Sequence, residues 1–326
     1  MNMYYRPVSA GGLELSGNIF LAPVAGWTDR VFRGLCVEAG ADFAFTELVS
    51  SEALYRGGGQ SLNLLRRAEN EKLYAIQLFG AKPDVMARAA ARVLEYVPAL
   101  IDINAGCPVP KVTKTGAGSA LMLEPKRLAD VVAAVVREAG IVPVSVKLRS
   151  GWDGAHINYE ECARAACDSG AVMISLHPRS RAQGYEGKSD WTHIARLAAA
   201  LDVPVCGSGD LYSPEDALAM LKETGCAAVM FARGAMGNPF IFSQTHALLA
   251  DGGYSIPSAR EKFNMAMRHL EALAYELGEA RAALEMRKVF CAYIKGINGA
   301  AALRSALVHA GSIEEYRTLI QPFLCR

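Results

Sequence analysis

The sequence lacks long hydrophobic runs, paired cysteine motifs and an excess of charge of either sign. No stretch approaches the roughly 20 consecutive apolar residues that a membrane-spanning helix needs, and residues 1–7 lack the basic-then-apolar profile of a signal peptide. The 34 Lys and Arg nearly balance the 33 Asp and Glu, so a strongly basic protein that coats nucleic acid non-specifically is not expected. A local basic patch is still compatible with this balance.

The eight cysteines contain no C-x-x-C pair, and no cluster of histidines accompanies them. Neither a metal site nor a disulfide framework is therefore expected, and free thiols without an export signal point to the cytoplasm. Cys107 lies in a Gly-Cys-Pro turn. We interpret the other seven as packing residues: Cys36, Cys162, Cys167, Cys206, Cys226, Cys291 and Cys325.

The chain has enough apolar material for a large core. It contains 326 residues, of which 52% are hydrophobic and 21% are charged, and this composition excludes a disordered or fibrous chain. With about 150 residues in a typical domain, the length indicates two domains or one large α/β barrel with an appendage.

Short apolar runs alternate with amphipathic stretches between residues 19 and 249. The expected strands are residues 19–23, 43–49, 74–79, 100–104, 144–148, 172–177, 203–206 and 228–232. Apolar strands separated by helices indicate a parallel sheet that is buried on both faces. Eight such units favour a (β/α)8 TIM barrel over an open doubly wound sheet, whose G-x-G-x-x-G fingerprint is not found after the first strand.

A Gly-, Pro- and Ser-rich break at residues 250–258 separates this pattern from one that is helical only. Helices are expected at residues 260–277, 284–294, 301–310 and 313–323, so we predict a barrel domain over 1–250 and a small helical domain over 251–326. Residues 281–308 carry five basic side chains against one acidic one. This segment is either a solvated helix face or a surface that binds a polyanion.

Polar and reactive residues stand where the apolar strands end, which is where barrel enzymes place their active sites. They include a thiol, an amine, an imidazole and two glycine-rich loops. In chain order they are Ala22, Pro23, Val24, Ala25, Gly26, Gln77, Asp102, Asn104, Cys107, Lys147, His177, Arg179, Gly207, Ser208, Gly209, Asp210, Ala232, Arg233 and Gly234.

The roles of these residues stay open at this point. The two glycine-rich loops, at 207–210 and 232–235, favour a phosphate site over simple tight turns, because small residues let backbone N–H groups approach an anion. Lys147 can act as a Schiff-base amine, hold negative charge on a cofactor, or extend to solvent. Cys107 suits a nucleophile or a proton donor, and His177 suits a core residue or a site residue.

Six stretches together resemble the tRNA-dihydrouridine synthases, FMN-dependent bacterial enzymes that reduce specific uridines in tRNA. They follow the family's order through the barrel, and the similarity weakens in the C-terminal helices. The stretches are residues 22–29 (APVAGWTD), 102–108 (DINAGCP), 116–121 (GAGSAL), 146–152 (VKLRSGW), 177–181 (HPRSR) and 233–235 (RGA).

The resemblance implies a bound, non-covalent FMN at the barrel mouth. Pro23, Val24 and Ala25 would line the isoalloxazine ring, and Gln77 would hydrogen-bond to it. Lys147 would stabilise negative charge near N1, and His177 would contact the cofactor. The ribityl-phosphate end would be held by Ser208, Gly209, Asp210, Ala232 and Arg233.

The resemblance also implies the chemistry and the partner. Flavin N5 would deliver a hydride to C6 of uracil, Cys107 would give a proton to C5, and NADPH would reduce the flavin again. Asn104 would lie beside flavin and uracil. A monomer that binds no metal is expected. The residues expected to contact tRNA are Lys111, Lys114, Arg179, Arg181, Arg287, Lys288 and Lys295.

One loop departs from the family pattern, since Ser208 stands where asparagine is usual; we expect retained FMN binding with altered affinity. Three other functions stay open. The first is an FMN-dependent barrel oxidoreductase that acts on a free small molecule, like a dihydroorotate dehydrogenase. The second is a lyase with Lys147 as a Schiff base. The third is a tRNA-binding module without catalysis. The basic helical segment argues against the first, and Cys107 argues against the third.

Overall fold

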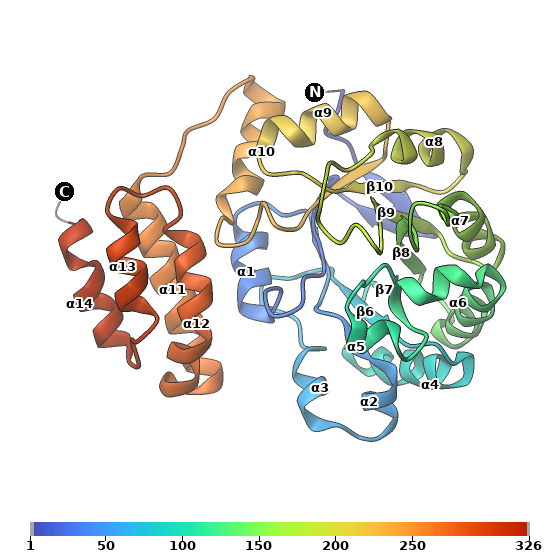
Figure 1. The fold of residues 1–326 in the computed structure, drawn as a ribbon, viewed down its shortest axis with the longest axis horizontal. Coiled ribbons are helices and arrows are strands. Elements are labelled where there is room, and N and C mark those ends of the chain that lie inside the picture. The colour runs from blue at the N-terminus through green and yellow to red at the C-terminus, as the bar shows by residue number, and fades with distance from the viewer. Residues whose placement is uncertain (1–2, 325–326) are drawn as a thin grey trace.

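A computed structural model describes residues 3–324, and within this range nine parallel strands form one curled sheet (Figure 1). Neighbouring strands follow the order β4-β3-β11-β10-β9-β8-β7-β6-β5. The strands are β3 (Ile19–Leu21), β4 (Phe43–Ala44), β5 (Val49–Ser50), β6 (Ala75–Phe79), β7 (Leu100–Ala105), β8 (Val144–Gly151), β9 (Met173–Ser180), β10 (Val205–Ser208) and β11 (Ala228–Phe231).

The two ends of this order, β4 and β5, belong to one stretch of chain that closes the sheet. β4 pairs with β3, and the next residue, Phe45, bridges to Ala75 of β6. β5 then continues the pairing with β6, where Val49 lies opposite Leu78. The stretch from β4 to β5 thus acts as one interrupted barrel strand, and the predicted (β/α)8 barrel is confirmed.

A short antiparallel hairpin precedes the barrel and was not predicted. β1 (Val8–Ala10) pairs with β2 (Leu13–Leu15) across a turn in which Gly11 and Gly12 both have positive φ, at 56° and 86°. The apolar residues of the hairpin join the cluster that fills the barrel interior. Two glycines between alternating apolar residues are a hairpin signal, so this element was readable from the sequence.

Helices cover the outside of the barrel. Proline occupies the first turn of α4 (Pro83–Val93), α6 (Pro125–Ala139) and α9 (Pro214–Thr224), where its missing N–H costs no hydrogen bond. The other flanking helices are α1 (Arg30–Glu38), α2 (Ser51–Tyr55), α3 (Gly59–Asn63), α5 (Pro110–Thr113), α7 (Tyr159–Asp168), α8 (Thr192–Ala200) and α10 (Phe240–Asp251), with 3-10 turns at Leu94–Tyr96 and Gly118–Leu123.

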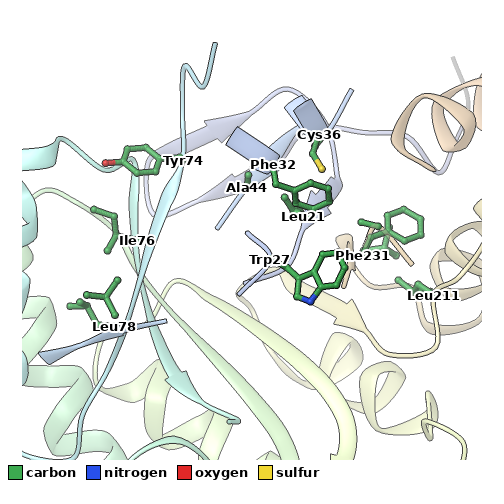
Figure 2. Packing of buried hydrophobic residues seen from close by; sticks show 14 of the residues in the cluster. Leu21, Trp27, Phe32, Cys36, Ala44, Tyr74, Ile76, Leu78, Leu211 and Phe231 are labelled. Carbon is green, nitrogen blue, oxygen red and sulfur yellow. The ribbon is translucent and has the colours of Figure 1, made fainter. Parts of the chain in front are cut away.

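Alternation along the strands separates two apolar layers. Tyr74, Ile76 and Leu78 belong to the layer that packs against the helices (Figure 2). Ala75, between them, lies in the cluster inside the barrel. Met230 of β11 belongs to the interior cluster and also lines the cavity described below. The packed interior therefore forms the floor of that cavity.

Four further helices form a bundle beside the barrel, next to α1 (Figure 1). They are α11 (Ala259–Leu277), α12 (Glu279–Tyr293), α13 (Ala300–Leu307) and α14 (Ile313–Leu324). α12 begins five residues before the predicted position, because Gly278 with φ 81° is the only residue between α11 and α12. None of the helices within residues 3–324 is long and apolar enough to cross a membrane.

The bundle contacts α1 through buried aromatic groups and surface ion pairs. The His269 ring of α11 stacks on Phe32 at 5.6 Å, and its Nδ1 lies 3.1 Å from the Tyr293 hydroxyl. At the edge, Arg268 pairs with Glu38 at 2.6 Å. Bundle and barrel thus share apolar surface, and their assignment as the separate domains 1–250 and 251–326 stays a prediction.

One buried ion pair ties α1 to the loop before β6. Arg33 and Glu71 are each 1% exposed, and two parallel hydrogen bonds of 2.7 and 3.0 Å join the guanidinium to the carboxylate. Arg33 also donates to the carbonyls of Thr28 and Arg66. This pair fixes the segment that leads from the mouth of the barrel into α1.

Most of the cysteines are packing residues as predicted. Cys36, Cys162, Cys206 and Cys226 are buried, and Cys167 and Cys291 are half-buried. Cys325 lies outside the described residues. Within residues 3–324 no group of three or more His, Cys, Asp or Glu side chains is arranged to hold a metal ion.

Candidate active site

A cavity of about 320 Å3 opens at the carboxyl ends of the barrel strands. This is within the usual volume of a small-molecule site. It brings together most of the predicted cofactor-binding and catalytic residues. Its lining consists of Ala22, Pro23, Val24, Ala25, Leu48, Asn104, Gly106, Cys107, Pro108, Val109, Lys147, Arg149, His177, Tyr185, Ser208, Gly209, Asp210, Leu211, Tyr212, Met230, Ala232 and Arg233.

The loop that carries Cys107 is held by hydrogen bonds on both sides. The Asn104 side-chain oxygen accepts from the backbone N–H groups of Gly106 at 3.1 Å and Cys107 at 2.8 Å. The hydroxyl and the backbone N–H of Ser119 both donate to the Cys107 carbonyl, at 3.0 and 3.1 Å. The thiol therefore stands on a rigid loop.

The Cys107 thiol is half-buried and faces the cavity. Burial raises its pKa above the usual value of 9.0, and the nearby charges of Arg149 and Lys147 offset only part of this effect. The group is consequently a protonated thiol at neutral pH. A protonated thiol can give a proton to a bound molecule, whereas a nucleophilic cysteine needs a lowered pKa.

Lys147 of β8 also faces the cavity. Burial lowers its pKa to about 8, and the charge of Arg149 acts in the same direction. Its ammonium makes no hydrogen bond or ion pair within residues 3–324. An unpartnered amine at the wall of a cavity favours a ligand with negative charge at this point.

His177 of β9 is a neutral imidazole. Burial lowers its pKa well below 6.5, and the charges of Lys147, Arg149, Arg179 and Arg233 act in the same direction. Its Nε2 lies 3.2 Å from the Arg179 guanidinium, which can only donate. The proton of the neutral ring must therefore be on Nδ1.

Arg179 is buried and does not line the cavity. It is 2% exposed, and it donates to Asp210, to Ser189 and to the carbonyls of Glu186 and Gly187. Its guanidinium is thus engaged by protein groups, and its contact with tRNA phosphates stays a prediction. Alternate strand residues share a direction, so Arg179 points inward as His177 does.

Asp210 organises the corner of the cavity at which the sequence predicts a phosphate site. It takes the left-handed conformation, with φ 56°. Its carboxylate accepts from Arg179 at 2.8 Å, from the Ser189 backbone N–H at 2.8 Å and from Arg233 at 3.2 Å. The Arg233 guanidinium also lies over the rings of Tyr185 and Tyr212, at 4.6 and 5.2 Å. This corner is positively charged and fixed.

Gly209 gives the corner its space. Its φ is 114°, and a Cβ atom there would lie 2.4 Å from the Ser189 hydroxyl and 2.8 Å from Cδ2 of His177. The neighbouring Ser208 turns its hydroxyl to the Met230 carbonyl at 3.1 Å, so this side chain ties β10 to β11. The backbone of this loop is left to face the cavity.

Gln77 lies one layer below the cavity and does not line it. It is fully buried, and it connects Asn104 to Asp102 through hydrogen bonds of 2.8 and 2.6 Å. Its hydrogen bond to a flavin ring stays a prediction, for which one hydrogen of the amide NH2 is left.

The residues predicted to contact tRNA are spread over the surface. Lys111 and Lys114 are exposed beside the Cys107 loop, and Lys288 and Lys295 are exposed on the helical bundle. Arg181 is half-exposed and lies 4.6 Å from the Trp152 ring. Arg287 donates to the carbonyls of Ala310 and His309, so part of its guanidinium is used inside the bundle.

Three lining residues with polar side chains were missed by the sequence analysis: Arg149, Tyr185 and Tyr212. Arg149 donates to the carbonyls of Gly106, Ser180 and Gly184, and burial lowers its pKa to about 10. Its position two residues after Lys147 on one strand was the available signal. Tyr185 and Tyr212 stand on loops whose positions only the tertiary structure sets.

The comparisons with known proteins point to one family. The family model described as dihydrouridine synthase matches residues 20–323. A probable tRNA-dihydrouridine synthase of Treponema pallidum is 50% identical, covering 97% of this chain and 96% of that protein. The tRNA-dihydrouridine synthase B of Xanthomonas campestris is 36% identical, covering 96% and 94%.

Solved structures share the barrel at low identity. An old yellow enzyme homologue from Zymomonas mobilis superposes with a TM-score of 0.53 at 14% identity, covering 78% of this chain and 95% of that chain. A histamine dehydrogenase from a Rhizobium species reaches 0.57 at 12% identity, covering 82% and 51%. These likenesses support the fold alone. The family model and the close relatives extend over nearly the whole chain, and the chain therefore belongs to the dihydrouridine synthase family.

Proposed function

We propose that this protein reduces the C5–C6 double bond of uridines in tRNA, with FMN held in the cavity and NADPH as the source of electrons. The observation that carries the proposal is the position of the protonated Cys107 thiol, which faces the same cavity as Lys147 and the Gly209 corner. Membership of the family and the names of the relatives support it.

The residues present fit FMN at both of its ends. The unpartnered ammonium of Lys147 suits the electron-rich edge of an isoalloxazine ring, while Pro23, Val24 and Ala25 offer an apolar wall. The space at Gly209 and the charge of Arg233 suit a phosphate. Bound flavin supplies hydride chemistry. Ser208, Asp210, Ala232 and His177 would shape the space between the two ends.

Cys107 would complete the reduction. Addition of a hydride at C6 of uracil places negative charge on C5 and the C4 carbonyl, and C5 then takes the proton from the Cys107 sulfur. The thiolate that is left recovers its proton from solvent, so the net change is the gain of two hydrogens by the base. Asn104, which holds the Cys107 loop, would lie beside the base.

The protein would act as a monomer, and its helical bundle, residues 251–326, would bind the tRNA. A uridine that reaches the cavity must leave its base stack, which costs a few kcal/mol, and contacts with the RNA backbone have to offset this cost. The exposed Lys288 and Lys295 on the bundle, and Lys111, Lys114 and Arg181 at the mouth, would contribute. Arg287 would contribute only with the guanidinium nitrogen that its carbonyl contacts leave free.

The decisive experiment combines the purified protein with FMN, NADPH and an unmodified tRNA transcript. We expect mass spectrometry of the digested RNA to find dihydrouridine, formed in proportion to NADPH consumed. The matched reaction with free uridine should give no product. Equal reduction of a free small molecule would instead indicate a small-molecule oxidoreductase, and absence of dihydrouridine would refute the proposal.

Replacement of Gly209 with alanine is expected to abolish retention of FMN. A methyl group would collide with Ser189 and His177, and φ 114° is unfavourable for any residue with a Cβ atom. The flavin content of purified protein, read from its visible absorption, measures the effect. Gly154→Ala is the matched control, because nothing lies within 4 Å of its added Cβ. Equal flavin content in the two variants would contradict this assignment.

The affinity for FMN is expected to fall as the pH rises above the Lys147 pKa of about 8. Below this pH the amine is charged and attracts an anionic group, and above it the charge is lost. Titration of flavin fluorescence at pH 7, 8 and 9 measures the change. In Lys147→Met the dependence over this range should vanish, whereas the exposed Lys295→Met should retain it; a pH-independent affinity of the wild type would overturn the role.

A further inference from the structure

A buried chain of side-chain hydrogen bonds runs from β8 to the Cys107 loop. The Ser145 hydroxyl donates to Asp102 at 2.5 Å, and the other Asp102 oxygen accepts from Gln77 at 2.6 Å. The Gln77 oxygen accepts from Asn104 at 2.8 Å, and the Asn104 oxygen accepts from the Cys107 backbone N–H. Ser145, Gln77 and Asp102 are fully buried.

The groups at the two ends of the chain fix its direction. The amide groups of Gln77 and Asn104 each have a donor end and an acceptor end, so neither sets the direction by itself. The N–H groups of Gly106 and Cys107 can only donate, and they fix the loop end of the chain. A carboxylate can only accept. It therefore turns the Gln77 NH2 group toward itself, which turns the Gln77 oxygen toward Asn104, which in turn leaves the Asn104 oxygen for the loop.

We infer that Asp102 is a positioning residue, and that the direction it sets along this chain holds the Cys107 loop in place for proton donation. Reversal of the two amides would aim the Asn104 NH2 group at the N–H groups of Gly106 and Cys107. Donors would then face donors, and neither N–H group would have an acceptor. The loop would then lose both contacts with Asn104. This inference rests on the proposed role of Cys107.

Asp102 can serve in this way because it is charged at neutral pH. Burial raises its pKa to about 6, while the hydrogen bonds from Gln77 and Ser145 and the charge of Lys147 oppose the rise. The ion therefore persists at the pH at which the proposed reaction is run. The hydrogen bonds from Gln77 and Ser145 also offset part of the free-energy cost of burying this carboxylate.

A double-mutant cycle of Asp102→Asn and Ser145→Ala tests the inference. In Ser145→Ala the carboxylate still only accepts. In Asp102→Asn the Ser145 hydroxyl rotates to accept from the new NH2 group, so the asparagine oxygen stays toward Gln77. Each single change should raise the rate of Cys107 alkylation by iodoacetamide less than about threefold. In the double variant neither the Asp102 carboxylate nor the Ser145 hydroxyl holds this orientation. The alkylation rate of the double variant should therefore exceed the product of the single effects by about tenfold.

Ser175 provides the matched control. It is a fully buried strand serine on β9, and its hydroxyl makes no hydrogen bond to Ser145, Asp102, Gln77 or Asn104. Asp102→Asn with Ser175→Ala should therefore show effects that simply multiply. The half-buried Cys291 on α12 serves as the internal reference, and its alkylation rate should be the same in every variant.

Alkylation is measured on the full-length protein without tRNA, so it does not depend on the proposed reaction. If the Asp102–Ser145 effects multiply as the control does, the positioning role is wrong. If the double variant does not fold, Gln77→Leu removes the middle link instead and should raise the alkylation rate about tenfold as well. A wild-type rate in that variant would equally overturn the inference. Wild-type protein that forms no dihydrouridine refutes the proposed function while leaving this cycle interpretable.

Discussion

Replacement of Cys107 with alanine is expected to lower kcat for the reduction of uridine in tRNA about 10²- to 10⁴-fold. The hydride step leaves a carbanion-like C5, and without a positioned acid the proton must come from water. The thiol suits this task because burial keeps it protonated at neutral pH. The loss is measured in single turnovers, as the rate at which pre-reduced enzyme is oxidised by tRNA.

The binding of FMN and tRNA should survive this change. The Cys107 loop is held by backbone contacts with Asn104 and Ser119, which do not involve the thiol. Flavin content and the tRNA dissociation constant are therefore expected to stay within about twofold of wild type. Cys291→Ala, a half-buried thiol on the helical bundle, is the matched control and should retain full turnover. Wild-type turnover in Cys107→Ala would show that another group donates the proton.

Breaking the Arg33–Glu71 pair should be the most destabilising change among those considered. Arg33→Met leaves a buried carboxylate without its partner, and Glu71→Leu leaves a buried guanidinium. Each single variant is expected to lose about 3–5 kcal/mol of unfolding free energy. The double variant should lose much less than the sum, because it leaves no unpaired charge. Urea unfolding followed by circular dichroism measures all three.

An exposed ion pair supplies the comparison. Arg281 and Glu285 lie 2.9 Å apart on α12 with side chains 66% and 45% exposed, so solvent already screens both charges. Arg281→Met should change the unfolding free energy by less than about 1 kcal/mol. If Arg33→Met were as mild, the buried pair would not hold the β3–α1 segment as described.

The strand–helix pattern and the strand-end residues were predictable from the sequence. Strands of apolar residues, prolines in first helical turns and glycines with positive φ are local signals, because each depends on only a few neighbouring residues. The same holds for Lys147 and Cys107, since barrel topology brings the ends of all strands to one mouth. The hairpin at Gly11 and Gly12 carried such a signal and was overlooked.

Only the tertiary structure decided where the longer polar side chains go. Arg179 and Arg149 both stand at strand ends in the sequence. Arg179 pairs with Asp210, and Arg149 joins the loop after β7 to the end of β9 and the loop that follows it. Gln77 proved to be a link between Asp102 and Asn104. A side chain of several bonds can reach many partners, and the one it takes depends on loops far along the chain. Local sequence sets the backbone of this protein, whereas burial and charge pairing between distant segments select its contacts.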